Sequence, residues 1–113
     1  MMTERKRKII DALRGALNYC GYNYDEVVSK KSRQRIYSDL RSIIWSIYQT
    51  EADLPFKQVG IDFDWDRITV YHALARAKDF RKVDRNFADM YDSIYGAYLN
   101  AYSSKQEEAG MSS

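Results

Sequence analysis

Apolar residues recur at intervals of three and four along almost the whole chain, and this spacing limits the fold more than any other feature of the sequence. It is typical of amphipathic α-helices, whereas half-buried strands alternate apolar and polar residues. The chain has one proline and no Asn-Gly or Asp-Gly dipeptide, so it lacks the signals of a short β-hairpin. We therefore predict an all-α fold, a compact helical domain of about five to six helices.

Three helices are predicted in the first half of the chain. Thr3 can cap the first, and Gly21 stands where a left-handed residue would end it. Asp25 can cap a single helical turn, and Ser32 can cap a long helix after the basic loop 29–32. The residues predicted to face the core are Ile9, Ile10, Leu13, Leu17 and Cys20 in the first helix, Val27 and Val28 in the turn, and Ile36, Leu40, Ile43, Ile44 and Ile47 in the long helix.

Two shorter helices are predicted to follow, joined by a tight loop. Pro55 can open a helix that ends near Gly60, with Phe63 filling the turn beyond it. Asp66 can cap a second helix that runs from Arg67 to about Phe80. Its predicted inward residues are Val70 or Tyr71, Leu74 and Ala77. This layout is that of a helix-turn-helix unit.

Asp84 can cap a last, tyrosine-rich helix, whose apolar positions include Phe87, Met90 and Ile94. Its tyrosines either cover the core or meet a second copy of the chain, and covering the core is the favoured use. No apolar pattern remains near the C-terminus, so we predict one domain over 1–103 and a disordered tail over 104–113. The tyrosines in question are Tyr91, Tyr95, Tyr98 and Tyr102.

The composition favours a cytoplasmic protein of bacterial or phage origin. Cys20 is the only cysteine, so no internal disulfide can form. No apolar stretch approaches the roughly 20 residues that a membrane span requires, and the N-terminus lacks the apolar segment of a signal peptide. We therefore expect no membrane partner.

Positive charge is concentrated upstream, where 16 of the 18 lysines and arginines lie within residues 1–83. The run 5–8 is interpreted as a solvated surface. A second series around the basic loop can neutralise phosphates. It comprises Lys30, Lys31, Arg33, Arg35 and Arg41.

The sequence carries no recognisable catalytic or metal-binding motif. It has no Gly-x-x-x-x-Gly-Lys loop, so we expect neither nucleotide binding nor ATP hydrolysis. His72 stands alone and is interpreted as a packed or hydrogen-bonded structural residue. Asp62, Asp64 and Asp66 lack the glycine and glutamate of a calcium loop, which favours cap and turn roles. We therefore predict a non-enzymatic protein without cofactor or metal.

The start of the helix after Asp66 carries residue types that suit DNA reading. In helix-turn-helix proteins, the N-terminal side chains of the second helix reach base edges in the major groove. Arg67 can donate two hydrogen bonds to guanine, and Thr69 can donate or accept. Asp66 can accept from cytosine or orient Arg67. Layout alone does not distinguish this use from an ordinary solvated helix.

The stretch from about residue 9 to residue 80 resembles domain IV of the bacterial replication initiator DnaA, a helix-turn-helix domain of the Trp-repressor-like superfamily. The family's segment Gly-Gly-Arg-Asp-His-Thr-Thr-Val-Leu-His-Ala is matched in order by Asp66, Thr69, Val70, His72 and Ala73. Departures are Arg67 in place of a base-reading histidine, Ile68 in place of the first threonine, and a turn that is one residue shorter. The family's target sequence is therefore not expected to be the preferred site.

The resemblance implies double-stranded DNA as the partner. The basic loop would lie along the duplex and send Arg33 or Arg35 into the minor groove, with Lys30, Lys31 and Arg41 on phosphates. Lys57 is a further candidate phosphate contact. Since the initiator's ATPase portion is missing, what remains is site binding.

Two hypotheses stay open. In the first, the chain is a sequence-selective DNA-binding regulator of replication or transcription. In the second, it is a protein-interaction module that kept the fold and lost DNA reading, since acidic residues beside the groove surface repel phosphate unless capping or pairing absorbs their charge.

Overall fold

The computed structural model describes residues 2–30 and 34–111, with side chains described through Ser104. No strand occurs in these ranges, and six helices follow one another, so the all-α prediction is confirmed. None of the described helices combines the length and the apolar composition of a membrane-spanning segment. The helices are α1 (Glu4–Tyr19), α2 (Tyr24–Val28), α3 (Arg35–Ala52), α4 (Phe56–Phe63), α5 (Arg67–Val83) and α6 (Arg85–Met111).

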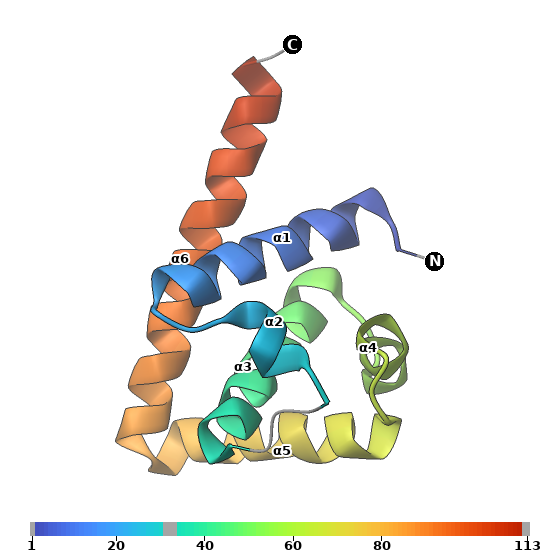
Figure 1. Ribbon diagram of the computed structural model, residues 1–113, viewed down its shortest axis with the longest axis vertical. Coiled ribbons are helices and arrows are strands. Elements are labelled where there is room, and N and C mark those ends of the chain that lie inside the picture. The colour runs from blue at the N-terminus through green and yellow to red at the C-terminus, as the bar shows by residue number, and fades with distance from the viewer. Residues whose placement is uncertain (1, 31–33, 112–113) are drawn as a thin grey trace.

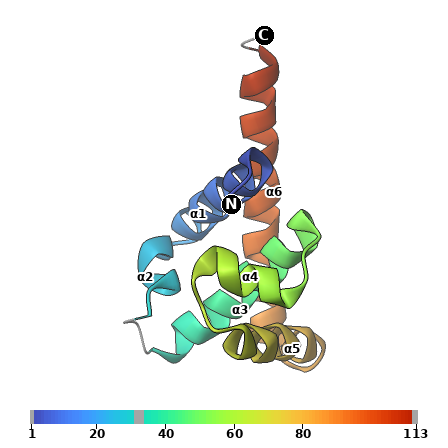
Figure 2. The ribbon, with the colours of Figure 1, turned by 90° about the vertical axis from the view of Figure 1, so that its right-hand side faces the viewer.

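Helix α3 lies at the centre of the molecule and contacts every other helix (Figures 1 and 2). Its buried face carries large apolar side chains, as the spacing predicted for Leu40 through Ile47. The predicted start was wrong: Gln34 occupies the N-cap position, without a side-chain hydrogen bond, and Ser32 lies outside the described residues. Ile36 therefore falls in the first turn at the edge of the bundle and is exposed, contrary to the prediction.

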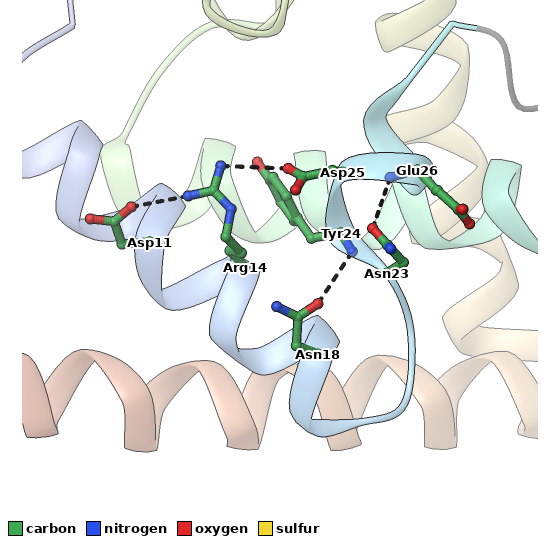
Figure 3. Close-up of polar contacts among 7 residues, drawn as sticks. All are labelled: Asp11, Arg14, Asn18, Asn23, Tyr24, Asp25 and Glu26. Atoms are coloured by element: carbon green, nitrogen blue, oxygen red, sulfur yellow. Dashed lines mark hydrogen bonds and ion pairs between the residues drawn. The ribbon is translucent and has the colours of Figure 1, made fainter.

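The two ends of α1 lie at the capping residues that the sequence predicted, whereas α2 begins at a different cap. Thr3 accepts a hydrogen bond from the Lys6 amide, and Gly21 has a φ of 93°, as predicted. Asn23, rather than Asp25, caps α2 by accepting from the Glu26 amide at 3.1 Å (Figure 3). Asn and Asp are equally good caps, and Asn23 lies two positions before the predicted cap.

The close-up in Figure 3 also shows how α1 holds α2. Asn18 Oδ1 accepts from the Tyr24 amide at 3.4 Å. Arg14 lies between two carboxylates, those of Asp11 at 3.4 Å and Asp25 at 3.7 Å. The Arg14 guanidinium also lies over the Tyr24 ring, 5.1 Å from its centroid. The buried Tyr24 ring thus anchors a helix too short to be stable alone.

Helix α4 extends beyond the predicted end. Pro55 is the N-cap, and the helix passes through Gly60 to Phe63. The left-handed residue that ends it is Asp64, with a φ of 55°. Gly60 is instead a buried position inside the helix, where a neighbouring segment approaches closely.

The last two helices begin at their predicted caps. Asp66 accepts from the amides of Ile68 and Thr69, and Asp84 accepts from the Phe87 amide. On α5 the buried residues include Val70 rather than Tyr71, which is half exposed. The buried rings of the C-terminal tyrosines, those of Tyr91 and Tyr98, cover the core as favoured.

The backbone of α6 continues as a helix to Met111, whereas the sequence analysis predicted a disordered tail from residue 104. The C-terminal part of the helix extends past α1 and away from the other helices (Figure 1). The segment 105–109 is rich in lysine, glutamine, glutamate and alanine, which prolong an established helix without an apolar face. Apolar spacing in the sequence therefore gives no sign of this last part of α6.

A buried carboxylate ties α4 to α1 and α3. Asp62 accepts from Tyr48 Oη at 2.6 Å and from Gln58 Nε2 at 2.8 Å, and it pairs with Lys6 Nζ at 3.0 Å. Burial acts to raise the pKa of Asp62, but the hydrogen bonds from these three residues outweigh it, so the pKa lies below the ordinary value of 3.8. The charged form is therefore the one that stabilises the fold.

Asp62→Asn should lower the free energy of unfolding at neutral pH by about 1–3 kcal/mol, because Lys6 then loses its counter-ion in a largely buried position. Because the pKa of Asp62 is lowered in the folded state, the stabilisation from its charged form is fully present above the ordinary carboxyl pKa. It is lost as the pH falls through the folded-state pKa. Urea unfolding should show the difference between wild type and variant shrinking in acid. The exposed Asp64→Asn should change little, and an equal loss in both variants would contradict this account.

Candidate nucleic-acid interface

The turn between α4 and α5 is fixed by backbone contacts. The Trp65 amide donates to Gly60 O at 2.9 Å, and the Asp64 amide donates to Ile61 O at 3.2 Å. A Cβ on Gly60 would lie 2.8 Å from Trp65 O and 3.4 Å from Arg67 Cα. Only glycine therefore lets the start of α5 approach α4 this closely.

The first turn of α5 presents the predicted reading residues to solvent. Asp66 Oδ2 accepts from the Ile68 amide at 3.1 Å and from the Thr69 amide at 3.3 Å, so the carboxylate caps the helix. Arg67 and Thr69 are both exposed. The side chains predicted to meet bases thus extend from a capped helix start.

Two side chains join this turn to the segment before α3. Trp65 Nε1 donates to Val28 O at 3.0 Å, and Arg41 Nη1 donates to Val27 O at 2.9 Å. The Arg41 guanidinium also lies 4.8 Å from the centre of the Trp65 ring. Val27 and Val28 form the C-terminal end of α2, where helix carbonyls lack partners within the helix. We call this set the α2 C-terminal link.

Arg41 does not lie on the open surface, where a phosphate contact was expected. Its exposed fraction is 8%, and its guanidinium is part of the α2 C-terminal link. Burial, and then the charge of Arg76, lower the pKa of Arg41. Sequence reasoning counted Arg41 with the basic loop because spacing does not reveal that an arginine faces inward.

The remaining predicted phosphate contacts are exposed where the structure describes them. Lys30 lies 3.7 Å from Asp64, which brings the end of the basic loop beside the α4–α5 turn. Arg35 is exposed in the first turn of α3, and Lys57 is exposed in the first turn of α4. Lys31 and Arg33 lie outside the described residues.

The three aspartates around the turn are each engaged. Asp62 is buried against Lys6, Asp64 faces Lys30, and Asp66 caps α5. No group of His, Cys, Asp and Glu residues that could hold a metal ion occurs in the described part of the chain. Cap, turn and pairing roles therefore account for all three carboxylates.

Two other residues from the sequence analysis occupy contrasting positions. His72 is exposed, and its ring makes a T-shaped contact with the ring of Tyr71, so it is not the packed or hydrogen-bonded residue that was predicted. Cys20 is half buried, and desolvation raises the pKa of its thiol, as expected for an unreactive cysteine.

A pocket of about 340 Å³ beside the first turns of α5 contains residues that sequence reasoning did not single out. Arg76 is the most informative of them, since it lies seven positions after Thr69 and so on the same face of α5. This seven-residue spacing is the sequence feature that could have indicated Arg76 as a neighbour of Thr69. The pocket is lined by Ser38, Arg41, Trp45, Thr69, His72, Ala73 and Arg76.

Gly60→Ala should destabilise the protein by about 1–3 kcal/mol, because the new methyl group meets the Trp65 carbonyl oxygen. Gly96→Ala is the matched control: Gly96 lies in the middle of α6 with nothing within 4 Å of an added Cβ, so this change should stabilise by about 0.5–1 kcal/mol. Chemical denaturation measures both. A Gly60→Ala variant as stable as wild type would show that the turn does not need the close approach.

Comparison with known proteins identifies no family for this chain. No protein-family model, no curated protein and no solved structure matches the chain. The argument for a function therefore rests on the α4–α5 turn, the α2 C-terminal link and the basic residues near them.

Proposed function

We propose that the chain binds double-stranded DNA selectively, with α4 and α5 acting as a helix-turn-helix and α5 entering the major groove. The observation that carries the proposal is the start of α5, where Asp66 caps the helix while Arg67 and Thr69 stay exposed. Side chains at this position reach base edges in helix-turn-helix proteins. This is also the function that the resemblance to DnaA domain IV implies.

The charges near the turn support a nucleic-acid partner. Lys30 and Arg35 are exposed; Lys30 belongs to the basic loop, and Arg35 lies in the first turn of α3, which follows it. The acidic residues that would oppose binding are offset, since Asp62 is neutralised by Lys6 and Asp66 is occupied as a cap. Repulsion of phosphate is therefore weaker than the number of aspartates suggests.

In this proposal Arg67 reads a base and the loop residues hold the backbone. A guanidinium can donate to both acceptors of guanine, whereas a lysine or arginine on a phosphate adds affinity without sequence preference. The chain would act in the cytoplasm as a regulator of replication or transcription, without ATPase activity of its own.

Selection of bound duplexes from a randomised pool tests this function, with wild type, Arg67→Ala and the control Arg85→Ala compared. Arg85 is an exposed arginine at the start of α6, so the control removes an equal charge away from α5. We expect an enriched motif that Arg67→Ala relaxes at one position, by about 1–3 kcal/mol of discrimination, and that Arg85→Ala keeps. Equal effects of the two variants would reject α5 as the reading helix.

A protein-interaction module is the second candidate, and exposed apolar residues favour it. Ile61, Ile68 and Tyr71 on α4 and α5 are exposed by 69%, 52% and 50%. Salt dependence separates the two functions, because release of counter-ions makes DNA affinity fall steeply with salt and an apolar interface responds much less. No enriched motif, together with weak and salt-insensitive DNA binding, would favour the module.

A further inference from the structure

The pocket between α3 and α5 is cationic and contains no acidic side chain. Arg41 and Arg76 both line it, and none of its lining residues is an aspartate or glutamate. Among the described residues neither arginine forms an ion pair. Two guanidinium groups therefore share a partly enclosed site without a counter-ion, which is an unfavourable arrangement in a protein interior.

Two residues that line this pocket each carry a buried hydrogen-bond donor with no acceptor among the described residues. Trp45 is 1% exposed, and within the described part of the chain neither its buried Nε1 nor the buried Nε of Arg76 has a hydrogen-bond partner. Arg76 is held from α3 by its Nη2, which lies 3.0 Å from Ser38 Oγ and 3.1 Å from Ser42 Oγ. A buried N–H without an acceptor is unfavourable and uncommon in folded proteins, so such groups call for an explanation.

We propose that this pocket binds one phosphate-type oxyanion, whose oxygens accept hydrogen bonds from Arg76 and from Trp45 Nε1. The positive charge of Arg41 adds attraction, and Thr69 and His72, which also line the pocket, are exposed. A tetrahedral anion supplies both the missing negative charge and several acceptors at once. The same chemistry is offered by a phosphodiester of duplex DNA and by free phosphate.

The indole N–H signals of the protein give a direct test. The chain has two tryptophans, and Trp65 Nε1 already donates to Val28 O, so its signal serves as the internal reference. Titration with inorganic phosphate at constant ionic strength should move the Trp45 indole proton downfield and leave that of Trp65 nearly in place. Sodium chloride at the same ionic strength should move neither.

Variants locate the site. Arg76→Gln should weaken phosphate binding by about tenfold or more, through loss of a charge-assisted hydrogen bond. Lys78→Gln, which removes an exposed charge from the same helix, should not. Trp45→Phe removes a donor that has no partner, so it should fold and yet lose most of the rise in melting temperature that phosphate gives to wild type.

The two sources are separated by adding duplex DNA in place of phosphate. If the pocket holds a backbone phosphate, duplex moves the Trp45 signal and free phosphate competes with it; if the ligand is free phosphate, only phosphate moves the signal. If neither ligand moves the Trp45 signal, the proposal that this pocket binds an oxyanion is rejected. It is also rejected if the Arg76→Gln variant binds phosphate as tightly as wild type. Duplex binding with no change at Trp45 from either duplex or free phosphate would reject this site and leave the proposed function standing.

Discussion

The capping of α2 by side chains from two other elements is the interaction on which the candidate interface depends. Arg41 and Trp65 donate to the carbonyls of Val27 and Val28, at the end of a helix that has only five residues. Helix carbonyl ends carry partial negative charge, so a guanidinium and an indole N–H are well suited to them. Because Arg41 belongs to α3 and Trp65 to the α4–α5 turn, one link joins three segments.

This link brings the start of the basic loop, at Lys30, beside the turn that leads into α5. The loop begins directly after the capped carbonyls, and the turn that carries Trp65 leads directly into Asp66 and Arg67. On the other side, Asp62 and the close approach at Gly60 hold α4 against the core. The orientation of α5 is thus set by contacts distributed around the turn, and its exposed first turn is free to meet a partner.

Local signals predicted the helices well, whereas tertiary contacts decided the details that matter for function. Thr3, Asp66 and Asp84 cap helices as their sequence positions predicted, since a cap depends on neighbours a few residues away. Gly60 was misread as a helix end, because close approach of Trp65 O is not visible in the sequence. Arg41 was expected on the open surface, and Arg76 was missed, for a related reason: whether an arginine faces water or a carbonyl depends on packing between distant segments.

We propose that Lys30, Arg35 and the first turn of α5 form a single DNA-binding surface, and amide chemical shifts during titration with duplex DNA test this proposal most directly. The account predicts that Lys30 and Arg35 shift together with Arg67 and Thr69, with one shared dissociation constant, while amides in the middle of α6 stay unchanged. Shifts confined to α6 or α1, or no shifts at all, would contradict it.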